Sequence, residues 1–182
     1  SYPAMQKKFK EFQLNAEQGE AMEGEVIGIL GANATGKTTF VKMLAGIEKP
    51  TKTEYNAKYS VSYKPQYLSP KKGITTKEIL EEQGINKPVF ESEIKKKLSI
   101  DSLMEKKLEK LSGGELQRTA IALCLSKDAD LYLLDEPSAF LDIEQRLQAA
   151  QAIKTVIEKR KKTGFVVEHD IVFQDHAANR II

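Results

Sequence analysis

Eight consecutive residues in the first quarter of the chain have the types and spacing of a phosphate-binding loop. They match the pattern G-x-x-x-x-G-K-[ST], follow the apolar run Glu25–Leu30, and open a helical pattern over Lys37–Ala45. In such loops backbone N–H groups and the lysine surround the phosphates, and the hydroxyl after the lysine ligates Mg²⁺. We expect these residues to bind a nucleotide: Gly31, Ala32, Asn33, Ala34, Thr35, Gly36, Lys37, Thr38 and Thr39.

Two positions of this loop differ from the glycine-rich filling that is common in phosphate-binding loops. They are occupied by Asn33 and Ala34. Because Ala34 lacks the freedom of glycine at positive φ, we expect the loop there either to adopt an ordinary backbone region or to carry slight strain.

A pair of adjacent carboxylates closes a second apolar run, Leu131–Leu134. Neighbours on a strand point to opposite sides, so Asp135 and Glu136 cannot share one task. We expect Asp135 to face Thr38 and hold Mg²⁺, and Glu136 to polarise the attacking water. An exposed surface pair is the alternative interpretation, and the phosphate-binding loop upstream weighs against it.

A serine and two glycines open a further helical pattern near the middle of the chain. Ser112 is a natural N-cap, and a capped helix with no other role is the simpler interpretation. A helix that starts with glycines is also suited to anions, because its N–H groups are uncovered and no Cβ blocks the approach. The sequence therefore predicts a second anion site at Ser112, Gly113 and Gly114. The apolar face of this helix is formed by Leu116, Ala120, Leu123 and Cys124.

The elements that position these residues predict an α/β fold, a P-loop NTPase core with a mainly parallel sheet flanked by helices and an N-terminal antiparallel β element. Helical spacing over Ile143–Lys161 provides the crossover that parallel neighbours require. The range Thr75–Lys110 has helical spacing and no strong strand pattern, which indicates a small helical subdomain. Strands are expected at Glu25–Leu30, Tyr59–Tyr63, Leu131–Leu134 and Phe165–Val167.

Length and composition bound the organisation of the chain. A length of 182 residues fits one compact domain, with a core of 1–67 and 117–182 and a helical insert over about 68–116. The net charge of +2 gives no general attraction to nucleic acid or membranes. One cysteine, no apolar run of about 20 residues and no signal-peptide pattern favour a cytoplasmic protein without membrane insertion.

The motifs together resemble those of the ATP-binding cassette superfamily, and the resemblance covers nearly the whole chain. Besides the phosphate-binding loop, or Walker A motif, five segments occur in the order of that superfamily. They are the Q-loop (Tyr63–Gln66), the signature motif (Leu111–Arg118), the end of Walker B (Asp135–Pro137), the D-loop (Ser138–Asp142) and the switch histidine segment (Glu168–Asp170).

This resemblance implies a Mg-ATP site that is completed by a second ATP-binding cassette domain. It implies that Ser112 and the signature glycines contact the γ-phosphate held by the facing domain. Gln66 would contact Mg²⁺ and the attacking water, while His169 would contact the γ-phosphate and act with Glu136 in catalysis. The resemblance also implies that Asp142 of the D-loop takes part in nucleotide binding. A lone histidine such as His169 is otherwise more often structural.

The adenine contact is expected from an aromatic residue before the phosphate-binding loop, as the resemblance implies. Phe9 is the candidate, and Tyr2 and Phe12 are the alternatives. Phe12 alternates with Leu14, which favours a position in the core for Phe12.

Longer strings resemble the RNase L inhibitor family, most closely its second, C-terminal nucleotide-binding domain. This similarity implies ATP-driven splitting and recycling of ribosomes, with ribosomal subunits and release-type factors as partners. One cysteine cannot hold iron–sulfur clusters and only one Walker A is present, so we expect a fragment of a twin-cassette protein. The alternatives are the ATPase subunit of a membrane transporter and a nucleotide-gated clamp with little turnover. The strings are SYKPQ (62–66), DADLYLLDEPSAFLD (128–142), EQRL (144–147) and VVEHD (166–170).

Overall fold

A five-stranded sheet is the centre of the chain. The computed structural model describes residues 1–32, 34–52, 59–66 and 71–182. The strand order is β4-β5-β6-β3-β7, and every pairing in this sheet is parallel. The expected α/β fold with a mainly parallel sheet is therefore confirmed. The strands are β3 (Val26–Ile29), β4 (Val61–Lys64), β5 (Leu131–Asp135), β6 (Thr163–Val167) and β7 (Arg180–Ile181).

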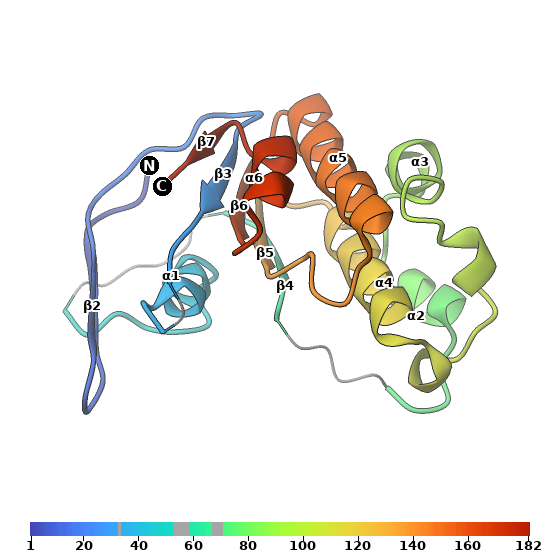
Figure 1. Cartoon of the computed structure of the whole chain (residues 1–182), viewed down its shortest axis with the longest axis horizontal. Helices are drawn as coiled ribbons and strands as arrows, with labels where there is room; N and C mark the ends of the chain where they lie inside the picture. Colours follow the sequence, from blue (N-terminus) through green and yellow to red (C-terminus); the bar gives the residue numbers. More distant parts are fainter. Residues whose placement is uncertain (33, 53–58, 67–70) are drawn as a thin grey trace.

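Helices cover both faces of this sheet (Figure 1). One face carries α1 (Lys37–Leu44), and the other carries α4 (Gly113–Ser126), α5 (Ile143–Lys159) and α6 (Ile171–Ala177). Successive residues of β5 alternate between the two cores, with Leu133 on the α1 side and Leu134 on the α4 side. Burial on both faces explains why the central strands are continuous apolar runs. The predicted crossover helix is α5, which connects the parallel neighbours β5 and β6.

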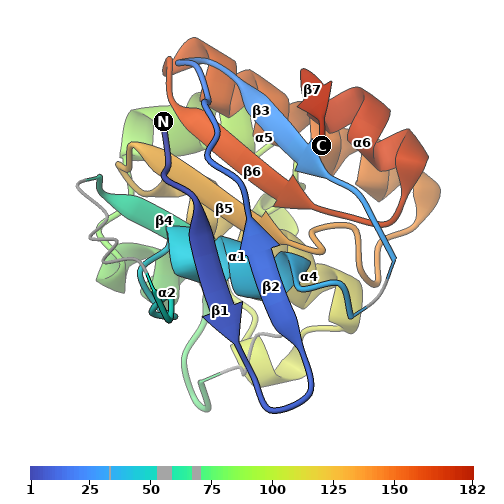
Figure 2. The same cartoon turned by 90° about the vertical axis from the view of Figure 1, so that its left-hand side faces the viewer.

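The N-terminal antiparallel element is also present. It consists of β1 (Met5–Lys8) and β2 (Gln13–Ala16), and these strands lie in front of α1 in Figure 2. Met5 is buried with the apolar residues of α1 and β3. The hairpin thereby places the segment between β1 and β2 beside the start of α1.

The expected helical insert consists of short helices. They are α2 (Thr76–Glu82), α3 (Lys87–Val89), one turn of π-helix η1 (Phe90–Ile94), and the 3₁₀ turns η2 (Asp101–Leu103) and η3 (Leu108–Lys110). Side chains of the insert, including Phe90 and Ile94, belong to the same apolar core as α4 and α5. The expected boundary between residues 67 and 68 lies outside the described residues.

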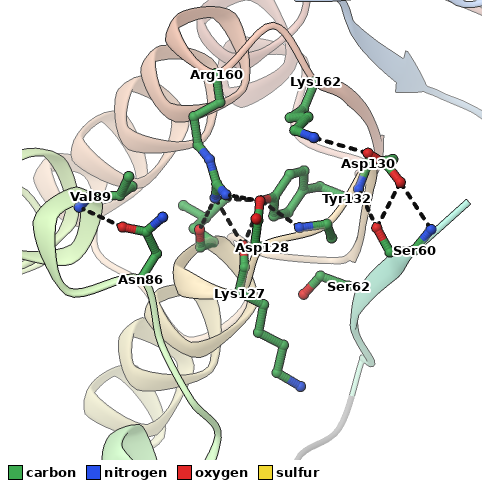
Figure 3. A network of polar contacts seen from close by, with 12 residues as sticks. Ser60, Ser62, Asn86, Val89, Lys127, Asp128, Asp130, Tyr132, Arg160 and Lys162 are labelled. Carbon is green, nitrogen blue, oxygen red and sulfur yellow. Dashed lines mark hydrogen bonds and ion pairs between the residues drawn. The ribbon is translucent and has the colours of Figure 1, made fainter.

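A polar network ties the elements together where β4, β5 and β6 begin (Figure 3). The Arg160 guanidinium donates to the Leu125 and Lys127 carbonyls at the end of α4, and to the Tyr132 hydroxyl at 2.5 Å. Lys162 and Ser60 both donate to the Asp130 carboxylate, at 2.9 and 2.8 Å. These bonds hold together the amino ends of β4, β5 and β6, at the edge opposite the carboxyl ends, where ligands bind to open parallel sheets.

Candidate nucleotide site

The phosphate-binding loop connects β3 to α1 as its sequence predicted. Gly36, the N-cap of α1, has a φ of 97°. A Cβ at this position would also lie about 3 Å from the side chains of Leu14 and Phe12, so glycine is required on two grounds. Ala34 has a φ of 62°, which lies in the left-handed region. Of the two expected alternatives at Ala34, the loop therefore carries slight strain. Asn33 lies outside the described residues.

The lysine of the loop bonds to the loop itself. The Lys37 ammonium donates to the carbonyl oxygens of Gly31 and Ala32, at 2.8 and 2.6 Å. The Thr35 hydroxyl donates to the same Ala32 carbonyl at 3.0 Å. The loop is therefore curled around the Lys37 side chain, and all three contacts join residues that were expected at the phosphates.

An open cavity of about 530 Å³ lies beside this loop. It collects residues from the loop and from the carboxyl ends of β4, β5 and β6, which is where ligands bind to open parallel sheets. Eight expected site residues line it, and the rest of the lining comes from Phe12 and Val167. The eight are Ala34, Gly36, Lys37, Thr38, Thr39, Gln66, Glu136 and His169.

Two side chains contact the Glu136 carboxylate. The Gln66 amide donates to one oxygen at 2.8 Å, and the His169 Nε2 lies 3.4 Å from the other. Gln66 follows β4, Glu136 follows β5 and His169 follows β6, so three neighbouring strands deliver these groups to one edge. The main chain of Glu136 itself turns sharply, with a φ of 46°.

Asp135 does not line the cavity but is buried beside Thr38, which does line it. The Asp135 side chain is fully buried, and neither carboxylate oxygen has a hydrogen bond of good geometry from the described residues. Burial raises the pKa of Asp135, while the Thr38 hydroxyl nearby opposes that effect. The Tyr63 hydroxyl is also buried without a hydrogen bond of good geometry from the described residues. Burial and, to a lesser extent, the nearby Asp135 carboxylate raise the pKa of Tyr63 to about 12. A buried, unsatisfied carboxylate next to a hydroxyl is suited to a cation.

Only one of the expected metal ligands, Asp135, is a carboxylate; the other two are Thr38 and Gln66. This set therefore differs from a cluster of three or more His, Cys, Asp or Glu side chains around one metal position, and the described part of the chain has no such cluster. A hydroxyl, an amide and a carboxylate are all oxygen ligands, which is the ligand type that Mg²⁺ prefers.

Three buried polar residues around the site were missed by the sequence analysis. The Lys64 ammonium donates to the carbonyl oxygens of Asp135 and Glu136, at 2.8 and 3.2 Å. The Gln117 amide donates to the same Glu136 carbonyl at 2.7 Å. Burial lowers the pKa of Lys64 to about 8, and the Asp135 carboxylate opposes this shift. The one indication in the sequence was that Lys64 occupies a position of the strand whose side chain points into the protein.

Glu168 is the third residue of this kind. Its buried carboxylate accepts hydrogen bonds from the backbone N–H groups of Ser138 at 3.0 Å and His169 at 2.8 Å. It thus connects the segment after β5 to the histidine segment after β6. Nothing in the sequence around Glu168, which directly precedes His169, indicated that its side chain would be buried.

The second expected anion site lies apart from the cavity. Ser112 caps α4, and its hydroxyl and backbone form a capping box with Glu115 at 3.3 and 2.9 Å. Neither Ser112 nor the two glycines after it line the cavity beside the phosphate-binding loop. A Cβ on Gly114 would lie 2.9 Å from the Phe140 carbonyl oxygen, so the D-loop packs closely on this helix start. Asp142 caps α5 through the Gln145 N–H at 2.8 Å.

The aromatic residues differ from expectation in one respect. Phe12 was expected in the core, but it is 38% exposed and lines the cavity, because the turn after β1 brings it against Gly36. Phe9 stacks on Phe12 with ring centroids 6.2 Å apart and does not itself line the cavity. Tyr2 packs edge-on against Phe40 and Phe165, away from the loop.

Known proteins with similar sequences align with all or nearly all of this chain. The chain is 42% identical to translation initiation factor RLI1 of Saccharomyces cerevisiae over 100% of its own length and 30% of the relative. It is 46% identical to ABC transporter E family member 3 of Arabidopsis thaliana, covering 88% of this chain and 93% of that protein. The chain spans about a third of the length of the first relatives it matches.

Solved structures agree with these relatives. One similar structure is a complex of an archaeal ribosomal stalk protein with the archaeal ribosome recycling factor aABCE1. The chain superposes on a chain of that complex with a TM-score of 0.93 and 47% identity, and the match covers 99% of this chain and 35% of the other. A model of ribosome-bound archaeal Pelota and ABCE1 gives the same TM-score at 48% identity, over 100% of this chain and 31% of that one. The family model described as ABC transporter matches residues 14–139. With the phosphate-binding loop, the acid pair and the capped signature helix all in place, the chain belongs to the ABC transporter family, the ATPases of the ATP-binding cassette type.

Proposed function

We propose that this chain binds Mg-ATP and hydrolyses it when a second cassette closes over the nucleotide. The observation that supports this proposal best is the meeting of Gln66, Glu136 and His169 at the cavity beside the phosphate-binding loop. Residues 1–182 would act as one cassette, with 1–67 and 117–182 as its core and about 68–116 as the helical insert.

The loop residues would bind the phosphates of ATP. The Lys37 ammonium would exchange its bonds with the Gly31 and Ala32 carbonyls for phosphate oxygens, which are stronger, charged acceptors. Backbone N–H groups of the described loop residues and of the start of α1 would add further donors. Phe12 and Phe9 form the aromatic surface next to this loop, and we propose that Phe9, supported by Phe12, contributes to the adenine contact.

Thr38, Gln66 and Asp135 would hold Mg²⁺. The buried, unsatisfied oxygens of Asp135 support this assignment, because a carboxylate in that position lacks a partner that a cation would provide. When bound, Mg²⁺ would neutralise negative charge on the transferred phosphoryl group.

Glu136 would orient and polarise the attacking water. Its carboxylate is directed into the cavity by the Gln66 amide, and His169 is placed to contact the γ-phosphate from the neighbouring strand. Ser112 and the signature glycines do not line this cavity, so they would serve the nucleotide of the facing cassette, with Asp142 at the same interface. Hydrolysis would then depend on pairing. The test is to measure ATP hydrolysis of this chain alone and with a second cassette, and equal slow rates in both would contradict the proposal.

We further propose that the hydrolysis drives the splitting or recycling of ribosomes in the cytoplasm. The support is the similarity to a translation initiation factor, to a ribosome recycling factor with a stalk protein, and to a ribosome-bound complex with Pelota. The ATPase subunit of a membrane transporter is the alternative, and the family model that matches the chain is described as ABC transporter. As a separate finding, none of the helices in the described residues has the length and apolar composition to span a membrane. Co-sedimentation of the Glu136→Gln protein with ribosomal subunits in the presence of Mg-ATP tests the partner. Recovery with a membrane permease instead would favour the transporter.

A further inference from the structure

The main chain of Glu136 adopts a conformation that glutamate rarely has. Its φ of 46° lies in the left-handed region, which costs a residue with a Cβ of the order of 1 kcal/mol or more. Such a conformation persists only where surrounding contacts enforce it. At this turn the direction of the Glu136 carboxylate depends directly on how the peptide groups on either side are held.

Three different elements hold this turn by hydrogen bonds. The Glu136 N–H donates to the Val167 carbonyl of β6 at 2.8 Å. The Glu136 carbonyl accepts from the Lys64 ammonium of β4 at 3.2 Å and from the Gln117 amide of α4 at 2.7 Å. The Ala139 N–H also donates to this carbonyl, at the longer distance of 3.4 Å, so the two side chains provide its shorter hydrogen bonds.

Both donors are removed from solvent. Lys64 is 1% exposed and Gln117 is 5% exposed. A buried ammonium is costly unless its protons are bonded, and Lys64 donates to the carbonyls of Asp135 and Glu136 in succession. Neither side chain lines the nucleotide cavity, so neither contacts the reacting atoms directly.

Gln117 belongs to the helix that starts at Ser112. Only four helical residues lie between them, and a helix moves largely as one rigid element, so a displacement of its start is transmitted to the Gln117 amide. In the proposed pairing the start of α4 faces the partner's nucleotide. The same helix therefore contacts one ATP site with its first residues and supports Glu136 of the other site with Gln117.

We propose that Lys64 and Gln117 are positioning residues that orient Glu136 through its carbonyl, and that Gln117 links the signature helix of this chain to its own Glu136. This inference rests on the proposed role of Glu136 in hydrolysis. Its structural part, that two side chains together hold the Glu136 turn, does not require ATP and can be measured separately.

The test uses Lys64→Met and Gln117→Leu, which keep most of the side-chain volume and remove the donors. Thr119→Val is the matched control, because it removes a buried side-chain bond to the Glu115 carbonyl in the same helix without contact to Glu136. The first readout is the carbonyl ¹³C chemical shift of Glu136, which responds to the loss of a hydrogen bond. The second is ATP affinity by calorimetry together with single-turnover hydrolysis by the chain paired with a second cassette.

We expect both variants to shift the Glu136 carbonyl resonance upfield, to keep ATP affinity within about twofold, and to slow hydrolysis roughly 10- to 100-fold through misplacement of the base. The Thr119→Val control should change neither the resonance nor the rate. If Lys64→Met does not fold, Gln117→Leu decides alone. An unchanged resonance, or a rate within twofold of wild type in folded variants, would overturn the inference. A wild-type chain that binds no ATP would instead refute the proposed function, and the resonance would still test how the turn is held.

Discussion

The Gln66 amide donates to the Glu136 carboxylate at 2.8 Å, although these residues stand 70 positions apart in the chain. The contact is possible because β4 and β5 are parallel neighbours that end at the same edge of the sheet. It fixes which oxygen of Glu136 faces Gln66 and leaves the other toward His169.

Lys37→Ala is expected to abolish ATP binding or to weaken it severely. The loop would lose the cation that lies between the Gly31 and Ala32 carbonyls and that we assign to the phosphates. Isothermal titration calorimetry with Mg-ATP measures the effect. Lys72→Ala, at an exposed position of the insert, serves as the control and should bind normally. Unchanged affinity of the Lys37 variant would contradict the assignment of the loop.

Glu136→Gln is expected to bind ATP and to stall hydrolysis. The amide keeps the shape of the side chain but cannot act as the base that a carboxylate can be. Single-turnover hydrolysis in the paired assembly, combined with a measurement of bound ATP, separates binding from chemistry. Turnover at the wild-type rate would remove Glu136 from the role of base and would favour a different residue at the cavity.

Ser112→Arg is expected to leave ATP binding to this chain intact and to slow hydrolysis at the partner's site by about 100-fold or more, the usual effect of losing a preorganised donor. The reason is that Ser112 lies at the start of α4, away from the cavity of its own chain. A mixed assembly that carries the substitution on this cassette only, with each site's turnover followed separately, is the measurement. Failure of this chain's own site with normal turnover at the partner's would show that the signature acts within one chain.

Asp130→Asn is expected to lower stability at neutral pH and to have no effect in strong acid. Hydrogen bonds from Lys162 and Ser60 lower the pKa of Asp130 to about 2. A carboxylate with a lowered pKa stabilises the fold above its unfolded value of about 3.9, and this contribution disappears as the pH falls through about 2. Since Asp130 is largely exposed, the difference should stay below about 1 kcal/mol.

Urea unfolding of wild type and Asp130→Asn between about pH 2 and pH 7 measures this difference. Asp175→Asn, an exposed position on α6, is the control and should follow the wild-type curve. A difference between wild type and Asp130→Asn that grows as the pH falls would contradict the predicted sign.

The sequence by itself determined the features that depend on local spacing. The run Glu25–Leu30 followed by the glycine loop predicted β3, the loop and α1 within one or two residues, because a buried strand and a helix start each have a local pattern. Ser112 predicted the N-cap of α4 for the same reason. The acid pair at the end of the run Leu131–Leu134 predicted different positions for the two carboxylates, since neighbouring side chains on a strand point to opposite sides. Asp135 is buried, whereas Glu136 lines the cavity.

Contacts between distant segments were decided only by the tertiary structure. The position of Phe12 depends on how the turn between β1 and β2 folds over Gly36, and alternation with Leu14 carried no information about that packing. The contacts of Lys64 and Gln117 with Glu136 join β4, α4 and the end of β5, which the chain order leaves far apart. Local patterns report which face of an element is apolar, whereas the partner of a buried polar group is fixed by the arrangement of all the elements around it.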